Sequence, residues 1–435
     1  MSELMSEHDP ERHEPPGAPD LAGSGGPRAV TDPLPPMFPG GMRIADAEEQ
    51  AVVDVLRRKR LFRYYGPEEG PSVVAELESA FADRMACAHA LGVSSGTAAL
   101  TCSLAALGVG PGDEVIVPAY TWIATAAAVM AVGAVAIIAE VDDSLTLDPA
   151  DLERRITDRT VAVLPVHMRG APADLDRILE VARSNRLRVV EDAAQATGGS
   201  YHGRRLGTIG DLGAFSLQFN KILTAGEGGL VITNDRRLYE RALMYHDVAA
   251  SQRTTLEPDE SFVGVTCRMS ELQGAVARVQ LDRLEDMLAA TRARCGQVKR
   301  SIGALARAKE IELRRTNDDA GDTGIALVMF APNTRLGGFM VESLRAEGVK
   351  AHLLYEPSRR DYHVAAHWGP VLARRSWTTG TPWVHGSSKV TYTPDSWPRT
   401  NDLLARAVHV DISPDLTDTQ TGQLTEALSK VLRAL

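Results

Sequence analysis

Short apolar runs alternate with segments of helical periodicity through the first half of the chain. The runs read EVIVP, AVAIIAEV, TVAVLPV and LRVVED, and segments such as Ala124–Val132 and Ala173–Ser184 separate them. Nearly continuous apolar strands of this kind are typical of parallel strands covered by helices on both faces. The pattern therefore predicts a layered α/β domain that extends to about Tyr245.

The pattern changes after Met269, where a long helical period continues to about Arg300. Beyond it, IALVMF and VKAHLL resemble strands that flank a helix around Leu336–Glu347, and Asp418–Leu432 is predicted to form a closing helix. We interpret this region as a smaller α+β domain, with the long helix bridging the two domains. The predicted domains are residues 42–285 and 286–435, and Trp368–Pro398 is predicted to be an irregular surface loop.

Residues 1–41 are rich in Pro, Gly, Asp and Glu and contain hardly any aromatic residues. Such a segment buries too little apolar surface to offset the entropy of ordering, so we predict a disordered N-terminal tail. It lacks the basic start and apolar run of a signal peptide, and no stretch of the chain is apolar for long enough to span a bilayer. We expect a cytoplasmic protein.

Charge and cysteine content narrow the possible functions. The chain has 435 residues, with 47 basic and 57 acidic side chains and a formal net charge of −10. A negative surface argues against nucleic-acid and membrane partners. Its four cysteines form no C-x-x-C pair, so neither a metal site nor a disulfide framework is predicted; isolated cysteines are usually buried small hydrophobes.

Two candidate motifs occur early in the predicted α/β domain. SSGTAAL, from Ser94 to Leu100, follows an apolar run and begins a helix, so its backbone N–H groups would face an anion. An ordinary helix cap is the alternative, and it is the more common explanation of such a motif taken alone. Trp122 follows EVIVP, at the strand edge where α/β sheets bind ligands, and would stack on a planar ring. A core or interface tryptophan is the alternative.

Two further motifs carry charged groups. Asp192 ends the strand LRVVED, where a buried carboxylate needs a cationic partner such as a protonated pyridine nitrogen. Lys221 follows Ser216 by five positions, between apolar runs and a glycine-rich turn. Partial burial would lower its pKa, and a neutral amine condenses with an aldehyde. A capping aspartate and an exposed loop lysine are the alternatives. In combination, the four motifs meet the requirements of a pyridoxal 5'-phosphate (PLP) site.

From about Met42 onwards, the chain resembles the DegT/StrS-type aminotransferases, which are fold-type I PLP enzymes that aminate keto-sugars and keto-cyclitols. The most specific matching segments are GVGPGDEVIVPAYTWIAT, VVEDAAQATGGSYHGRRLGTIGDLGAFS, NKILTAGEGG and RMSELQGAVARVQLDRL. The resemblance implies a large three-layer α/β domain with a mostly parallel sheet, and a smaller C-terminal α+β domain. It also implies an L-glutamate or L-glutamine donor and a homodimer with shared active sites.

The resemblance assigns a role to each matching residue. Lys221 would be the Schiff-base lysine and Asp192 the partner of the pyridine nitrogen, while Trp122 would stack on the ring. Gln195 matches a position near the ring and its hydroxyl group. The residues that would hold the phosphate are Gly96, Thr97 and Ser216.

The chain departs from the family pattern at two places. Relatives often read G-Y-N-Y-R-M where this chain reads Gly264–Met269, so Thr266 replaces the asparagine that reaches the phosphate of the neighbouring subunit. Arg169 stands in a segment that more usually reads His-x-Tyr-Gly, either as an anion-binding residue or as an exposed strand-end arginine. Two alternatives to an aminotransferase remain: a PLP-dependent dehydratase or aromatising synthase, and a non-catalytic PLP-binding regulator. The dehydratases carry histidine in place of Lys221, which argues against that branch.

Overall fold

The computed structural model describes residues 20–37, 43–64, 70, 72–355, 360–376, 382–383 and 390–435. A seven-stranded sheet forms the centre of the large domain, in the order β1-β9-β8-β5-β4-β2-β3. The strands from β8 to β3 are parallel, and β9 runs antiparallel to both of its neighbours. The strands are β1 His89–Val93, β2 Glu114–Pro118, β3 Val135–Ala139, β4 Thr160–Val163, β5 Arg188–Asp192, β8 Leu212–Ser216 and β9 Gly229–Thr233.

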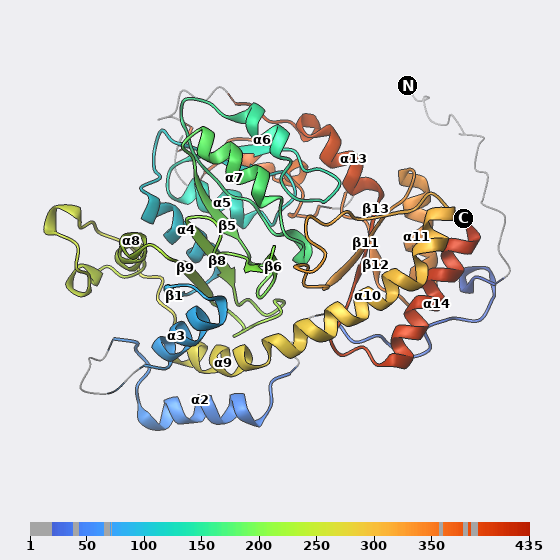
Figure 1. The fold of residues 1–435 in the computed structure, drawn as a ribbon, viewed down its shortest axis with the longest axis horizontal. Helices are drawn as coiled ribbons and strands as arrows, with labels where there is room; N and C mark the ends of the chain where they lie inside the picture. Colours follow the sequence, from blue (N-terminus) through green and yellow to red (C-terminus); the bar gives the residue numbers. More distant parts are fainter. Residues whose placement is uncertain are drawn as a thin grey trace, which may run out of the picture.

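Helices cover both faces of this sheet (Figure 1). One face packs against α4 Gly96–Leu107, α5 Ala124–Ala131 and α8 Arg236–His246. The opposite face packs against α3 Val73–Met85, α6 Pro149–Arg155, α7 Leu175–Ser184 and α9 Glu271–Asp282. Because successive strand residues point to opposite faces, both faces can be apolar, as the uninterrupted strand runs require. The predicted three-layer α/β domain is confirmed.

The small domain is built on a four-stranded antiparallel sheet in the order β10-β11-β13-β12. Its strands are β10 Glu312–Leu313, β11 Ala326–Phe330, β12 Ala351–His352 and β13 Ala407–Asp411. Its helices are α11 Thr334–Ala346, α13 Pro398–Arg406 and α14 Asp418–Ala434. This is the predicted α+β arrangement.

The helical run predicted from Met269 onwards is two helices, α9 and α10 Leu284–Ala308, which meet at Arg283. The first turns of α10 contribute Leu284 and Leu288 to the large-domain core, and its later turns contribute Val298 and Ile302 to the small-domain core. The long helix therefore bridges both cores, and the domain boundary expected between residues 285 and 286 falls inside its first turn.

The prediction of a disordered tail is wrong for residues 20–37, which we call the N-terminal strap. Leu21 and Val30 are buried in the small-domain core. The Glu347 carboxylate accepts hydrogen bonds from the backbone N–H groups of Ala22 and Ala29, each at 2.8 Å. Two apolar anchors and a buried carboxylate are enough to order this proline-rich segment. The remainder of the predicted tail lies outside the described residues.

The predicted surface loop Trp368–Pro398 is also partly wrong, because Trp368 and Trp397 are fully buried. β3 is an edge strand, and this segment satisfies its open hydrogen-bonding groups. Tyr392 Oη accepts from the Ile138 N–H at 2.8 Å, and Trp397 Nε1–H donates to the Ile138 carbonyl at 3.1 Å. Covering an edge in this way prevents pairing with another chain.

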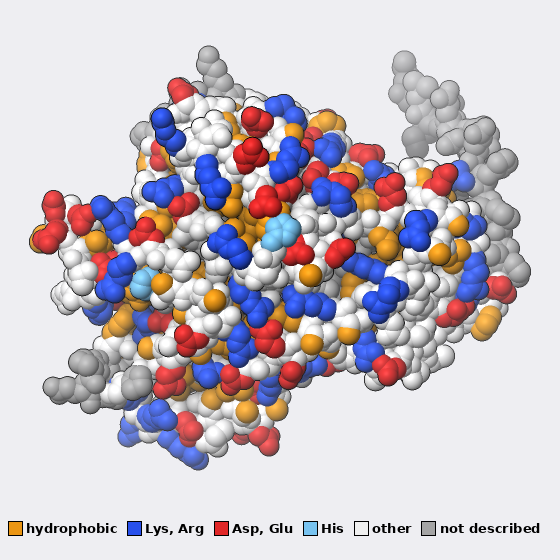
Figure 2. Space-filling view, in the orientation of Figure 1, with side chains coloured by type: hydrophobic (Ala, Val, Ile, Leu, Met, Phe, Trp, Pro, Cys, Tyr) orange, Lys and Arg blue, Asp and Glu red, His pale blue; other side chains and the backbone are white. Residues whose placement is uncertain are grey.

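Positive and negative side chains are interspersed on the face shown in Figure 2. Surface pairs such as Arg188 with Asp211 at 2.7 Å contribute to this mixture. In the described part of the chain, no helix has both the length and the apolar character needed to cross a membrane.

Candidate active site

Seven of the predicted site residues line one cavity of about 280 Å³ at the carboxyl ends of the parallel strands. These residues are Gly96, Thr97, Trp122, Asp192, Gln195, Ser216 and Lys221. The cavity forms where α4 and α5 begin, directly after β1 and β2, and where β5 and β8 end. The sequence motifs, up to 125 positions apart, therefore meet at one place.

The N-terminus of α4 forms one end of the cavity. Ser95 caps the helix by accepting a hydrogen bond from the Ala98 N–H at 3.0 Å. The first-turn N–H groups of Gly96 and Thr97 have no intrahelical acceptor, and the helix dipole is positive at this end. A Cβ at residue 96 would lie 2.7 Å from Ser216 Cβ, so only glycine permits this close approach. Together with the Ser216 hydroxyl, these groups make a cradle for an anion.

A buried carboxylate, that of Asp192, also lines the cavity. It accepts hydrogen bonds from the Thr125 hydroxyl at 2.8 Å and from the Ala194 N–H at 3.1 Å. Burial raises the pKa of Asp192, and the hydrogen bonds and the Lys221 ammonium oppose that rise. A cationic partner in the cavity would keep this carboxylate ionised. Thr125 was not predicted, although its position one turn after Trp122 could have suggested it.

Lys221 lies in the turn after β8, where its backbone N–H donates to the Gln218 carbonyl at 2.9 Å. Burial lowers the pKa of Lys221; the Asp192 carboxylate opposes this effect and the Arg169 guanidinium adds to it. The preceding residue, Asn220, has a buried Oδ1 atom with no partner among the described residues, and it lines the same cavity. A buried polar atom without a partner indicates that a ligand or water completes the site.

Trp122 lies at the mouth of the cavity with 46% of its surface exposed. Its ring centroid is 4.9 Å from that of His363, which also lines the cavity. Asp361 orients this histidine, since the Oδ1–Nδ1 distance is 2.8 Å. The sequence pattern assigns no role to His363, because the small domain brings it to the site over 240 residues after Trp122.

Gln195 and Arg169 are linked through the backbone. The Gln195 side-chain oxygen accepts a hydrogen bond from the Arg169 N–H at 3.2 Å. The Arg169 side chain is only 14% exposed and forms an ion pair with Asp411. The interpretation of Arg169 as an exposed strand-end arginine is therefore wrong. Its other interpretation, as an anion-binding residue, stays a prediction.

Thr266 is exposed and does not line the cavity of its own chain. Hydrogen bonds to the large domain hold the residues on either side of Thr266. The Val265 N–H donates to the Tyr245 carbonyl, and the Cys267 N–H donates to the His246 carbonyl. Its predicted contact with the phosphate of a neighbouring subunit stays a prediction.

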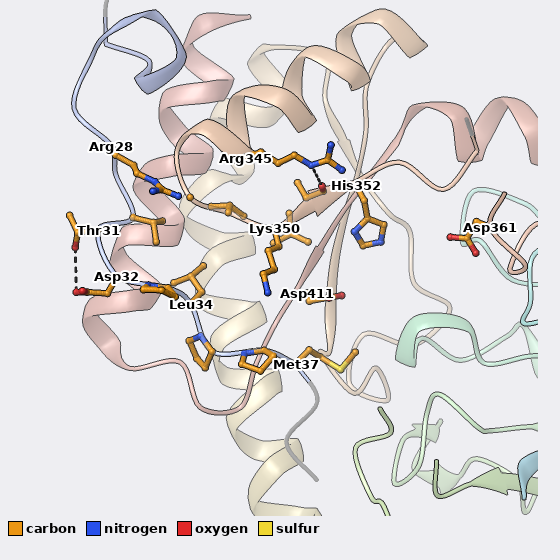
Figure 3. A pocket seen from close by; sticks show the side chains of 18 residues that line it. Arg28, Thr31, Asp32, Leu34, Met37, Arg345, Lys350, His352, Asp361 and Asp411 are labelled. Atoms are coloured by element: carbon orange, nitrogen blue, oxygen red, sulfur yellow. Dashed lines mark hydrogen bonds between the residues drawn. The ribbon is translucent and has the colours of Figure 1, made fainter. Parts of the chain in front are cut away.

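A second, larger cavity of about 750 Å³ lies between the N-terminal strap and the small-domain sheet (Figure 3). One of its lining residues, Asp361, pairs with His363 of the first cavity, and another, Asp411, pairs with Arg169, whose N–H is bonded to Gln195 of the first cavity. Lys350 extends between the strap and Asp411. Among the described residues it has no hydrogen-bonding or ion-pair partner. No sequence motif predicts this cavity.

Within the described residues, no group of three or more His, Cys, Asp or Glu side chains is placed to hold a metal ion. The first cavity brings together an anion cradle, a buried carboxylate and a buried amine. These three groups fit an elongated ligand that carries an anionic group at one end and a protonated nitrogen in its ring.

Comparisons with known proteins agree with this arrangement. GDP-perosamine synthase from Caulobacter vibrioides is 41% identical over 241 residues, which cover 53% of this chain and 62% of that protein. L-Glutamine:2-deoxy-scyllo-inosose aminotransferase from Micromonospora echinospora is 42% identical over 255 residues, covering 55% and 60%. Both matches thus span less than two thirds of the relative's length.

A solved structure, that of 3-amino-5-hydroxybenzoic acid synthase, superimposes with a TM-score of 0.75 at 26% identity. The superposition covers 92% of this chain and all of that chain. The model of the DegT/DnrJ/EryC1/StrS aminotransferase family matches residues 43–370, which include every predicted site residue. The chain belongs to the DegT/DnrJ/EryC1/StrS aminotransferase family.

Proposed function

We propose that this protein is a PLP-dependent aminotransferase that moves an amino group from L-glutamate or L-glutamine to a keto-sugar or keto-cyclitol. The observation that carries the proposal is the placement of Asp192 and Lys221 on one cavity with the anion cradle of Gly96. The names of the two relatives, one acting in perosamine synthesis and the other on an inosose, support both acceptor classes.

The residues present fit this cofactor. The cradle at Gly96, Thr97 and Ser216 would hold the phosphate, and Asp192 would keep the ring nitrogen protonated. When bound, PLP supplies an electron sink for the carbanion formed on the donor. Trp122 lies beside the cavity mouth, where its ring can cover one face of a planar ligand.

Lys221 is the group that moves protons in this proposal. Because burial lowers its pKa, its uncharged amine is available nearer neutral pH than that of an exposed lysine. It can therefore take the proton from the α-carbon of the amino donor and return it at a neighbouring carbon. Thr125 and the Ala194 N–H stabilise the charge of Asp192 during this transfer, and the protonated ring nitrogen of the bound cofactor would be its cationic partner.

We place the carbonyl acceptor in the larger cavity (Figure 3), whose lining residue Asp361 pairs with His363 of the first cavity. The strap side of this cavity is rich in proline and apolar residues but also carries Arg28, Thr31 and Asp32. The small-domain side carries Lys350, His352 and Asp361. A ring with one apolar face and several hydroxyl groups, such as a sugar or a cyclitol, matches these two walls.

The segment after α8 supports a homodimer as the assembly. This segment, residues 247–268, extends from the body at the left of Figure 1. It exposes three apolar side chains, with Val263 86% exposed, Val248 54% and Val265 48%. A group of exposed apolar residues marks an interaction surface, and a second copy of the chain would also bring Thr266 to a neighbouring site.

One specific observation favours a second candidate function. The similarity to 3-amino-5-hydroxybenzoic acid synthase supports an aromatising synthase that uses the same Asp192 and Lys221. Its product would be an aromatic amine in place of an amino-sugar or aminocyclitol.

The test follows the amino donor. The purified protein is loaded with PLP, and L-glutamate or L-glutamine is added without an acceptor. The proposal predicts that one donor bleaches the visible cofactor band and yields one equivalent of its 2-oxo acid, and that Lys221→Ala does neither. A panel of keto-sugars and keto-inositols then restores the band. An aromatic product would favour the synthase, and a stable band with no 2-oxo acid from either donor would favour a regulator.

A further inference from the structure

Two of the four cysteines meet in the structure although they are 165 positions apart. Cys102 is buried in α4, and Cys267 is half-buried in the segment before α9. Their Sγ atoms lie 3.6 Å apart, which is the contact distance of two thiols. Neither Cys87 nor Cys295 has a thiol partner; each contacts a backbone carbonyl, at 3.6 and 3.8 Å.

The two thiols differ in exposure and in their charged neighbour. Cys267 is half-buried and immediately precedes Arg268, whereas Cys102 is buried. The Cys102 S–H group and the Arg268 guanidinium lower the pKa of Cys267. A thiolate is the form that reacts with oxidants, so we assign Cys267 as the nucleophile of the pair. Cys102 is placed to react second.

The segment that carries Cys267 is bonded to the anion cradle. The Cys267 carbonyl accepts a hydrogen bond from the Ser94 N–H at 2.8 Å, and Arg268 pairs with Val93 as an isolated β-bridge. Ser94 immediately precedes Ser95, which caps α4 above the cradle. A displacement of Cys267 therefore acts on the turn that positions the Gly96 and Thr97 N–H groups.

We propose that Cys102 and Cys267 are a redox-sensitive pair, and that their oxidation to a disulfide displaces the Gly264–Met269 segment and weakens binding of a phosphate-bearing cofactor. The second half of this proposal rests on the proposed function. The disulfide itself does not, since it depends only on the two thiols.

A hydroperoxide is the oxidant in this proposal. The Cys267 thiolate attacks one peroxide oxygen, the O–O bond breaks, and the leaving oxygen takes a proton, so that Cys267 becomes a sulfenic acid. The Cys102 sulfur then attacks the Cys267 sulfur; the S–O bond breaks and the departing oxygen leaves as water with the Cys102 proton. With hydrogen peroxide, two thiols lose two electrons and the peroxide becomes two water molecules. A dithiol reductant reverses the change.

Oxidation requires the two sulfur atoms to move towards each other. A disulfide bond is about 2.05 Å long, so the sulfur atoms must approach by roughly 1.5 Å from their present separation. α4 is packed on the sheet by a continuous buried face, whereas residues 264–268 form no helix. We therefore expect the segment that carries Cys267 to move, and this segment is the one hydrogen-bonded to Ser94.

The first experiment counts and locates thiols. The folded protein is treated with hydrogen peroxide, unfolded in excess alkylating reagent and digested without reduction. We expect two of the four cysteines to escape alkylation and the Cys102 and Cys267 peptides to be linked. Cys267→Ser should prevent this linkage, whereas the control variant Cys87→Ser should not. Four alkylated cysteines, or a linkage between other cysteines, would overturn the proposal.

The second experiment measures the dissociation constant of PLP for the reduced and oxidised proteins. If oxidation removes one hydrogen bond between the cradle and the cofactor phosphate, the oxidised protein should bind PLP more weakly than the reduced protein by on the order of tenfold. Reduction should restore it, and Cys102→Ala should show no change on peroxide treatment. An oxidised protein with unchanged PLP affinity would overturn the coupling to the cradle. A protein that binds no PLP in either state would overturn the coupling and the proposed function together, while the linked peptides would still establish the disulfide.

Discussion

Two adjacent carboxylates on β5 have different roles: one stabilises the fold and the other faces the cavity. Glu191 and Asp192 point to opposite faces of the strand. Glu191 accepts hydrogen bonds from the backbone N–H groups of residues 207, 209 and 210 and contacts the His167 ring. Asp192 has fewer donors and faces the cavity. The first carboxylate holds a loop, and the second is free to bind a cationic ligand.

Conservative amide variants separate these two roles. Asp192→Asn should fold with an unchanged melting temperature but lower the rate of the donor half-reaction by on the order of a hundredfold or more, because the charge that keeps a ring nitrogen protonated is lost. Glu191→Gln should lower the free energy of unfolding by about 1–3 kcal/mol, because a buried acceptor of four hydrogen bonds is weakened. Stopped-flow absorbance and denaturant titration measure the two effects. Equal rate losses in both variants would contradict the assignment.

His246 gives a pH dependence of stability. Its Nδ1–H donates to the Leu243 carbonyl at 2.5 Å and its Nε2 accepts from the Tyr64 hydroxyl at 2.9 Å, so the buried ring is neutral. Burial lowers the pKa of His246 to about 4, below its value of about 6.5 in the unfolded chain. Between these values the unfolded state binds more protons, so stability is lost as the pH falls.

This group alone should reduce the free energy of unfolding by roughly 2 kcal/mol from about pH 7 to about pH 5. His246→Gln offers a non-titrating donor and acceptor at the same place. Denaturant titrations at the two pH values should show a smaller loss for the variant than for the natural protein. Parallel losses in both proteins would contradict the buried neutral ring.

At the scale of elements, the N-terminus of α4 and the end of β8 approach so closely that residue 96 must be glycine. In Gly96→Ala the new Cβ would press against Ser216, so the cradle must open. Overpacking of this kind costs about 1–3 kcal/mol, and PLP affinity should fall by on the order of tenfold. Gly338→Ala in α11 is the matched control, since its Cβ meets nothing within 4 Å. Equilibrium dialysis with PLP compares them, and equal affinities would contradict the cradle.

The elements that could be predicted are those that neighbouring residues in the sequence specify by themselves. Uninterrupted apolar runs predicted β2, β3, β4 and β5. A strand followed by a glycine-containing turn or a charged residue predicted the places of Gly96, Asp192 and Lys221, because the carboxyl ends of parallel strands meet at one edge.

Contacts between distant segments could not be predicted in this way. Ala22 bonds to Glu347 across 325 positions, and Cys102 meets Cys267 across 165. Arg169 pairs with Asp411, which belongs to the other domain. Composition alone assigned the strap to a mobile tail, since it carries only a few apolar anchors. Local periodicity does not encode such pairings.

At the scale of the whole molecule, the exposed segment 247–268 predicts association of two copies. Sedimentation velocity should give a particle of twice the 46.8 kDa chain mass. Val263→Asp places a charge on the most exposed of the large apolar side chains and should shift the protein towards monomer, whereas the neutral, similarly shaped Val263→Thr should not. A natural protein that sediments as a monomer at micromolar concentration would contradict the shared-site assembly.

Both domains contribute to the proposed cofactor cavity, since the large domain supplies most of its lining and the small domain supplies His363. The central claim is that Lys221 binds the cofactor in this cavity. The most direct test is to load the protein with PLP, reduce it with sodium borohydride and map the modified peptides. The account predicts one phosphopyridoxyl group per chain, attached to Lys221 and absent from Lys221→Ala. A label spread over several lysines, or no label on the Lys221 peptide, would contradict it.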